Sequence, residues 1–443
     1  MSAGSPHTRV AETPMAPDAG ARMHAFVAEL YPFCRSITGD GLRRTLALIA
    51  SRIPLELHEV PTGTPVFDWT IPREWNIRDA YVKNAKGERV IDFRESNLAV
   101  VSYSAPVRAT MTLAELRPRL HTLPDRPGWI PYRTSYYKED WGFCLSHDRL
   151  QSLPEGTYEA VVDSTLAPGS LTYGELLLRG ERADEVLISA HACHPSLAND
   201  NLASLAVATE LAGMLASAPR RYSYRFVFAP GTIGAIAWLA ANREGVDRIR
   251  HGLVLACLGD AGRPHYKKSR RGDALIDRVA AHVLTHHGPH AVREFSPLGY
   301  DERQYNSPGF DLPVGSLTRT PNGAYPEYHT SADDLAFVRP EALADSLSIL
   351  LDIVSVLEED AVYRSTSPFC EPQLGKRGLY AALGGRTSQD DLEVAMLWTL
   401  NLADGRHGLL DIAERSGLPF DRIRRAADLL REHELLVPAE DAR

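Results

Sequence analysis

The spacing of hydrophobic residues divides the first part of the chain into a helical segment and a β-rich segment. Residues 22–53 carry apolar side chains at helical spacing, as at Leu42, Leu46 and Ile49. From about residue 55, short β-type runs such as 98–103 alternate with turns rich in proline and glycine. The pattern predicts two helices followed by a small antiparallel β module.

Beyond residue 170 the pattern changes to strands that alternate with helices. Apolar runs typical of buried strands occupy 175–180, 186–194, 222–230 and 251–260, and helical spacing occupies 202–217, 233–243, 273–287 and 340–359. Strands separated by helices of this length usually pair in parallel. The sequence therefore predicts an α/β fold with a mostly parallel sheet and helices on both faces.

The last part of the chain is helical again. Residues 388–403, 408–417 and 419–433 form three helical patterns, and the tight turn SGLP between the last two is typical of a helix-turn-helix. Arg422, Arg424, Arg425 and Arg431 would favour DNA binding, but residues 388–443 hold seven Arg or Lys against twelve Asp or Glu. Because an acidic domain repels phosphate, we expect a winged-helix module used for packing or homo-oligomerisation.

These changes of pattern give the expected domain limits. The 443 residues exceed one usual core, so several domains are expected. We predict a disordered tail at 1–21, an α/β domain at 22–56 and 160–365, an inserted β domain at 57–159, and a winged-helix domain at 366–443.

Composition and charge narrow the class of partner. A net charge of −9 and a pI near 6.0 argue against a large phosphate-binding face and hence against a nucleic-acid partner. The five cysteines are scattered and include no CxxC pair, and neither a signal peptide nor a membrane-length apolar run is visible. We expect a cytoplasmic protein that acts on a small molecule or a peptide, with no membrane partner.

Candidate chemistry gathers where an apolar run meets a helix. His191, His194 and Asp200 follow the run 186–190, and imidazole nitrogen and carboxylate oxygen are ligands that suit Zn²⁺. A histidine at a strand end is more often a core residue, and an Asp before a helix is more often a cap. Two distant candidates strengthen the metal hypothesis: Asp260 at the end of another apolar run, and His329 in a polar loop.

Five motifs in order carry a family resemblance. The chain reads HxxHPSLANDN, YRFVFAPGTIGAIAWL, GLVLACLGD, YDERQY and PEYHTSADDL, after an early LYPFCRSITGDGLRRTL. This order resembles the aminopeptidase-like family related to the co-catalytic zinc exopeptidases and glutaminyl cyclases. The resemblance implies a zinc-exopeptidase-like α/β domain, a small inserted β domain and a C-terminal winged helix.

The resemblance also implies roles for individual residues. Asp200 matches the carboxylate that bridges two metals, Asp260 the ligand at a strand end, and His329 the last ligand. The first histidine is ambiguous, because His191 sits at the exopeptidase position and His194 belongs to the CHPS element. We choose His194.

The chain departs from the family pattern at a Glu-Glu pair. Gly231 stands where the general-base Glu is expected, and Thr232 where a second ligand is expected. One zinc ion therefore fits better than two, and the base that accepts the proton of water is unassigned. Glu302 and Glu327 are the candidate replacements.

From these residues we expect a zinc-dependent, aminopeptidase-like hydrolase of an amide bond in a small peptide or amino-acid conjugate, with a biosynthetic pathway as its expected setting. Arg303, Arg319 and Tyr328 are candidates for substrate binding, the arginines because a guanidinium can hold a carboxylate through two hydrogen bonds. Two alternatives stay open. One is a single-zinc acyl transferase or cyclase, and the other is a non-catalytic winged-helix scaffold or regulator.

Overall fold

The computed structural model of the protein describes residues 15–379 and 391–439. The chain forms two compact units. The first contains the residues up to Ala274 together with Ala291–Ser348, and the second contains Leu275–His290 and the residues from Ile349 onward.

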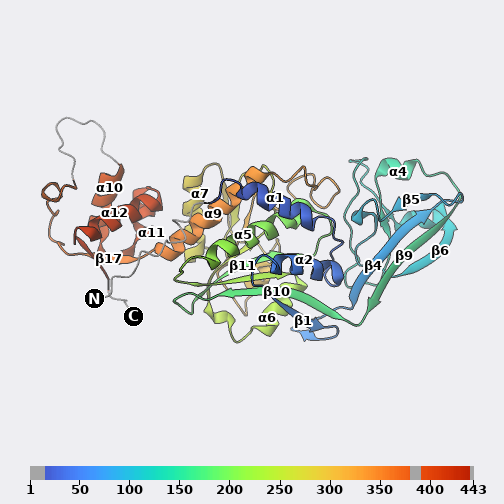
Figure 1. Ribbon diagram of the computed structural model, residues 1–443, viewed down its shortest axis with the longest axis horizontal. Coiled ribbons are helices and arrows are strands. Elements are labelled where there is room, and N and C mark those ends of the chain that lie inside the picture. The colour runs from blue at the N-terminus through green and yellow to red at the C-terminus, as the bar shows by residue number, and fades with distance from the viewer. Residues whose placement is uncertain (1–14, 380–390, 440–443) are drawn as a thin grey trace. The chain divides into compact units, whose positions relative to one another are not determined.

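A large mixed sheet is the centre of the first unit (Figure 1). Within the described residues it has eight strands, in the order β1 (Glu56–Pro61), β10 (Ser170–Leu178), β12 (Ser223–Ala229), β11 (Glu185–His191), β13 (Ile249–Leu255), β16 (Val314–Thr318), β14 (His265–Lys267) and β15 (Ala291–Arg293). Strands β12, β11, β13 and β16 are parallel to one another, while β10 and β14 join them in antiparallel. The predicted α/β class is confirmed, with a parallel centre and antiparallel flanks.

The parallel centre is what the apolar runs predicted. Every residue of β11 and β12 is buried, as expected for strands covered on both faces. Helices α1 (Ala19–Leu30) and α5 (Ser204–Ala216) pack together on one side of the sheet, and α6 (Ile233–Ala241) packs against β10 on the other (Figure 1). The carboxyl ends of the parallel strands therefore meet at one edge, where sites of open α/β sheets form.

The N-terminal helix begins inside the segment for which we expected no structure. Helix α1 starts at Ala19, and Ala19 and Gly20 are buried. A side chain at residue 20 would collide with the backbone of Pro340, so this glycine permits a close helix contact. Residues 1–14 of the predicted tail lie outside the described residues. The next helix, α2 (Asp40–Ala50), packs against β10.

The inserted β module has its own sheet and core. Its strands are arranged in the order β5 (Arg89–Asp92), β4 (Glu74–Lys83), β9 (Thr157–Ala167) and β6 (Val107–Thr112), with the short elements α3 (Leu113–Leu116), β7 (Leu120–His121), β8 (Phe143–Cys144) and α4 (His147–Gln151) packed around them. The sequence limit at residue 57 differs from the structure, because β1 pairs with β10 in the large sheet. Only from β4 onward does the chain enter the module.

One run expected as a strand has another conformation. Residues 98–103 lie partly in a short 3-10 turn over Asn97–Ala99, where the Ser96 hydroxyl accepts a hydrogen bond from the Leu98 N–H. A serine that bonds to the nearby backbone competes with strand pairing. The run is nevertheless buried, as its hydrophobicity indicated.

The second unit contains a winged-helix domain. Its described elements are β17 (Val362–Ser365), α10 (Asp391–Leu402), β18 (Asp404–Gly408), α11 (Leu409–Ser416), α12 (Phe420–Glu432) and β19 (Leu436–Pro438), and the strands pair in the order β18-β17-β19. Gly417 ends α11 in the left-handed conformation and gives the tight turn before α12. Residues 388–390 of the first predicted helix lie outside the described residues. Two further helices complete this unit: α7 (Leu275–His287) and the later part of α9 (Pro340–Glu359).

Candidate metal centre

The connection between β11 and α5 carries three deeply buried polar side chains. His191 is the last residue of β11, His194 follows in the loop, and Asp200 lies in an irregular turn, η4 (Ala198–Ala203), before α5. Their exposed fractions are 1%, 6% and 0%. Because burying unpaired polar groups is costly, such side chains must satisfy one another or a ligand.

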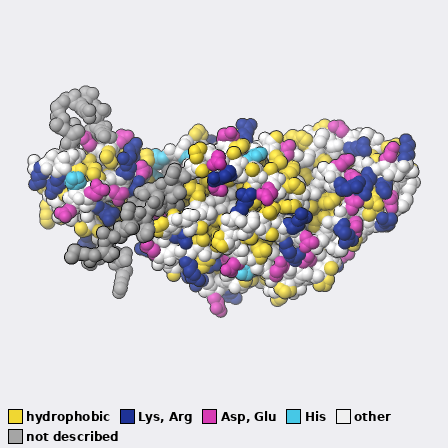
Figure 2. Space-filling view, in the orientation of Figure 1, with side chains coloured by type: hydrophobic (Ala, Val, Ile, Leu, Met, Phe, Trp, Pro, Cys, Tyr) yellow, Lys and Arg dark blue, Asp and Glu magenta, His cyan; other side chains and the backbone are white. Residues whose placement is uncertain are grey.

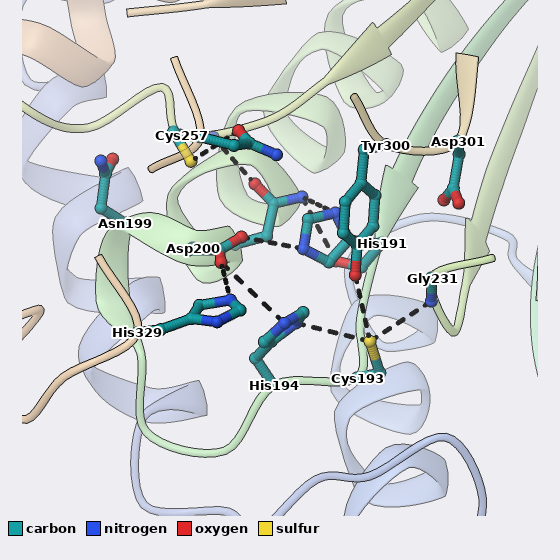
Figure 3. A network of polar contacts seen from close by, with 12 residues as sticks. His191, Cys193, His194, Asn199, Asp200, Gly231, Cys257, Tyr300, Asp301 and His329 are labelled. Carbon is teal, nitrogen blue, oxygen red and sulfur yellow. Dashed lines mark hydrogen bonds and ion pairs between the residues drawn. The ribbon is translucent and has the colours of Figure 1, made fainter. Parts of the chain in front are cut away.

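Three imidazole rings converge on the carboxylate of Asp200 (Figure 3). The Nε2 atom of His191 lies 2.9 Å from Oδ1, that of His329 lies 3.0 Å from Oδ2, and that of His194 lies 3.9 Å from Oδ2. His329 arrives from a loop 129 residues further along the chain. The structure thus brings together the predicted residues His194, Asp200 and His329, and adds His191.

The charges of this group are set by burial and by mutual contact. Burial lowers the pKa of His194 well below its usual value, so the ring is neutral at neutral pH. Burial opposes ionisation of Asp200, but the imidazoles of His194, His191 and His329 outweigh it and hold the pKa of this carboxyl well below its usual range. A carboxylate and a neutral imidazole are the protonation states that metal ligands require.

The donor set fits one zinc ion. The ligand atoms of His191, His194 and Asp200 lie within 4.8 Å of one another. Two imidazole nitrogens and a carboxylate oxygen are ligands of catalytic zinc sites, and His329 offers a third nitrogen on the other oxygen of Asp200. His191 ends strand β11, whereas His194 and Asp200 lie in the connection after it and His329 in a distant loop. The side chains therefore approach from different directions.

Two further residues hold the backbone that carries these side chains, and the sequence analysis missed both. The side-chain amide of Asn201 donates to the carbonyl oxygens of His191 and Leu255. The carboxylate of Asp333 accepts the backbone N–H groups of residues 199 and 200, at 2.6 and 3.0 Å. The acidic pair in SADDL was the available signal for Asp333, because a carboxylate on a distant loop can bind exposed amides at a helix start. Such outer partners usually tune ligand orientation.

Asp260 is held outside the group by other partners. Its Oδ1 accepts from the Gly262 N–H and the Thr320 hydroxyl, each at 2.6 Å, and its Oδ2 accepts from the Asn199 side chain at 3.0 Å. The residue after β13 that borders the group is Cys257 (Figure 3). Strand β13 ends at Leu255, five residues before Asp260, so the loop has already turned away from the strand edge at Asp260.

The position of the expected general base is filled by an aromatic side chain. A Cβ atom at Gly231 would collide with the hydroxyl and ring of Tyr300. That ring lies 3.9 Å from the His191 ring, and its hydroxyl contacts the Cys193 thiol at 3.6 Å. Gly231 and Tyr300 are therefore complementary in shape, and a carboxylate at residue 231 has no room beside Tyr300.

Next to Tyr300 lies a buried carboxylate that the sequence did not single out. Asp301 is 2% exposed and accepts the backbone N–H of Thr232 at 2.6 Å. Burial raises the pKa of Asp301 to about 6, against the opposing influence of His191 and of the Thr232 hydrogen bond. Figure 3 shows Asp301 beyond Tyr300, on the side of Gly231.

The two glutamates predicted as replacement bases differ from Asp301 in their contacts. Glu302 is 1% exposed, forms an ion pair with Lys267 and accepts the Tyr300 N–H. Glu327 is half-buried, and its backbone carbonyl accepts from Thr330 within the turn that carries His329.

The three residues predicted to bind substrate lie in different surroundings. Arg303 is exposed and reaches the hydroxyl of Thr232, at 3.4 Å, so it remains accessible from solvent. Arg319 is 8% exposed and forms an ion pair with Asp345. Tyr328 stacks on His329, with ring centroids 3.9 Å apart, and so supports a candidate ligand.

The inserted β module contributes to the site. Tyr132 is 6% exposed, and its ring lies 5.1 Å from the rings of both His194 and His329. Its N–H donates to the His329 carbonyl at 2.8 Å, and the backbones of Pro131 and Thr330 form a β bridge. The module therefore covers one side of the histidines, a contact that no local sequence pattern predicts.

The fit between Gly231 and Tyr300 gives a stability prediction. Gly231→Ala is expected to destabilise the protein by about 1–3 kcal/mol, because the added methyl overlaps the Tyr300 ring. In a Tyr300→Ala background the same change is expected to cost at least ~1 kcal/mol less, since the obstacle is gone. Thermal unfolding of the four proteins of this cycle measures the difference. An equal cost in both backgrounds would show that Tyr300 is not the obstacle.

The fold is shared with known zinc enzymes. The zinc aminopeptidase of Bacillus subtilis superposes with a TM-score of 0.56 at 13% identity, over 78% of this chain and 96% of that one. At this identity the likeness concerns the fold, which is an aminopeptidase-like α/β fold. The family model described as a domain of unknown function, DUF4910, matches residues 24–360, and a winged helix-turn-helix model matches 361–438. The chain belongs to the DUF4910 family.

A curated protein and a crystal structure, both from Clostridium acetobutylicum, show similarity over nearly the whole chain. One, provisionally named a polysaccharide biosynthesis protein with aminopeptidase-like domain, is 51% identical over 95% of this chain and 96% of its own length. The other, a crystal structure provisionally described as a peptidase, is 49% identical with a TM-score of 0.90, over 95% of this chain and 97% of that one. The resemblance found in the motifs is confirmed at the level of family and fold.

The surface gives two findings about partners. No helix in the described ranges is long and apolar enough to span a membrane. On the face seen in Figure 2, Lys and Arg side chains are interspersed with Asp and Glu and form no single basic surface.

Proposed function

We propose that the chain is a zinc-dependent hydrolase that cleaves an amide bond of a small peptide or amino-acid conjugate. The observation that carries the proposal is the convergence of three imidazoles on one buried carboxylate, Asp200, at the carboxyl edge of the sheet. We assign His191, His194, Asp200 and His329 as the residues that hold one zinc ion. His191 takes the place that the sequence gave to Asp260.

When bound, zinc supplies Lewis-acid polarisation of the amide carbonyl and activates water at neutral pH. Burial keeps the imidazole of His194 neutral. Asn201 holds the backbone of His191, and Asp333 holds the backbone of Asp200. Tyr132 covers the histidines and excludes bulk water from one side, which strengthens electrostatic interactions in the site. Arg303 is the accessible cation next to Thr232 and is assigned to the substrate carboxylate.

We propose Asp301 as the proton acceptor in place of a Glu at residue 231. It is buried beside Tyr300, fixed by the Thr232 N–H, and has a pKa of about 6, close to the value that suits a general base at neutral pH. It would take a proton from the attacking water and return it to the leaving amine. Glu302 forms an ion pair with Lys267 and is not assigned this role.

For the winged-helix domain we propose packing or self-association. In α12, Arg424 pairs with Glu359 and Asp421, and Arg431 pairs with Asp428. These pairs reduce the positive charge that a recognition helix offers to phosphate.

The name of the Clostridium relative supports a place in polysaccharide biosynthesis, where the amide would link an amino acid or acyl group to a sugar precursor.

Release of product from aminoacyl amides tests the proposal. A panel of aminoacyl p-nitroanilides and N-aminoacyl amino sugars is incubated with the zinc-loaded full-length protein. We expect turnover of at least one compound, loss of turnover with a chelator, and recovery when zinc is restored. Turnover of none, or turnover that the chelator leaves unchanged, would contradict the proposal.

A further inference from the structure

A pocket outside the metal cluster lies among the β2–β3 hairpin (Pro65–Val66 and Trp69–Thr70), α6 and α8 (Glu302–Tyr305). Its cavity volume is about 410 Å³. This volume lies within the range of small-molecule sites. None of the residues assigned to zinc or to proton transfer lines it.

Aromatic side chains form much of its wall, and two of them face solvent. Phe67 is 51% exposed and Trp69 is 39% exposed. Phe67 meets Phe310 edge-to-face, with ring centroids 5.7 Å apart. Phe67 also has a φ of 57°, in the left-handed region that Gly or Asn usually occupies in a two-residue hairpin turn. The chain thus keeps a large aromatic residue exposed at a position where a small residue would be less strained.

Three polar side chains that line the same pocket are available for hydrogen bonds with a ligand. Asp68, Arg243 and Gln304 line the cavity next to the aromatic rings. In the part of the chain that the structure describes, their side chains have no hydrogen-bond or ion-pair partner. A carboxylate, a guanidinium and an amide together accept and donate hydrogen bonds in several directions.

We propose that this pocket binds a pyranose ring. A pyranose presents a face of C–H groups that packs on aromatic rings, and a rim of hydroxyl groups that hydrogen-bonds to carboxylate, guanidinium and amide groups. A purely apolar ligand would make no hydrogen bond to Asp68, Arg243 or Gln304. Asp68 and Arg243 bring opposite charges to the same wall, which favours a neutral ligand with hydroxyl groups over an anion or a cation.

A series of aromatic contacts connects one wall of the pocket to the metal cluster. Trp69 meets Tyr137 with ring centroids 5.3 Å apart, and Tyr137 meets Tyr136 at 6.3 Å. The hydroxyl of Tyr136 lies 2.9 Å from that of Tyr132, which covers the histidines. The inference concerns binding alone and stands whether or not the site hydrolyses an amide.

Saturation-transfer NMR of the full-length protein tests this inference. The probes are the methyl pyranosides of glucose, galactose, mannose and N-acetylglucosamine, with indole as the apolar competitor. We expect saturation transfer to the C–H face of at least one glycoside. In Trp69→Ala the affinity for that glycoside is expected to fall by about tenfold or more. Phe369→Ala, which removes another exposed aromatic side chain, is the control and is expected to bind normally.

Three outcomes would overturn the inference. The first is no saturation transfer to any of the four glycosides, and the second is binding that Trp69→Ala leaves unchanged. The third is displacement by equimolar indole, which would assign the pocket to apolar ligands. Circular dichroism of Trp69→Ala checks that the fold is kept, and Phe67→Ala provides an independent second variant on the same wall.

Discussion

Asp200→Asn is expected to remove stoichiometric zinc binding and to lower zinc affinity by at least ~100-fold, more than loss of an outer partner usually costs. The reason is that all three imidazoles meet at this one carboxylate, with Nε2 of His191 and His329 within 3.0 Å of its oxygens. An amide carries no charge to balance the cation, and one of its two ends is a donor. Elemental analysis and a competition titration with a zinc chelator measure the change.

The matched control is Asp260→Asn. Asp260 is also a buried aspartate, in the loop after β13, but its oxygens accept from Gly262, Thr320 and Asn199. We expect this variant to lose stability and to keep its zinc. The reverse result, zinc retained in Asp200→Asn and lost in Asp260→Asn, would contradict the role given to Asp200 and would make Asp260 the ligand. Circular dichroism of both variants separates metal loss from unfolding.

Asp301→Asn is expected to lower kcat/KM by about 10²–10⁴-fold while zinc stays bound, because an amide cannot accept a proton. In the parent protein the pH profile should carry the same signature. Asp301 accepts a proton only when ionised, so kcat/KM is expected to rise as pH increases through about 6 and then to level off. In Asp301→Asn this acid limb is expected to disappear from the residual activity.

The control for this prediction is Glu327→Gln, which neutralises a half-buried carboxylate on the His329 loop. We expect its rate and its acid limb to match those of the parent. If Glu327→Gln lost activity and Asp301→Asn kept it, the base would be Glu327. If neither variant lost activity, neither Asp301 nor Glu327 would be the base.

Local sequence patterns predicted the strands that are fully buried, because burial on both faces favours apolar residues. The continuous apolar runs that became β11 and β12 are buried along their whole length, so hydrophobicity alone marks them. Strand β1, in contrast, reads ELHEVP and has exposed or half-buried residues throughout, because it lies at the edge of the sheet. Its pairing with β10 is a long-range contact that the composition of either segment does not reveal.

In the candidate site, too, local patterns predicted some residues and long-range contacts determined the others. His194 and Asp200 were predictable because a strand-to-helix connection with polar ligands is a local motif. The contact of Tyr300 with Gly231 joins segments about 70 residues apart, and Tyr132 arrives from the inserted module. Asp301 gave the pattern of a surface carboxylate because its neighbours Glu302 and Arg303 are charged, and only the fold shows that it is buried.

The zinc content of the parent protein tests the central claim most directly. The full-length chain is purified without a nickel-affinity tag, stripped with a chelator, and titrated with zinc in a calorimeter, with elemental analysis of the product. We predict one tightly bound zinc per chain, released when His329 and His194 are both replaced by alanine. A parent protein that binds no zinc, or that binds it equally well without these histidines, would contradict the account.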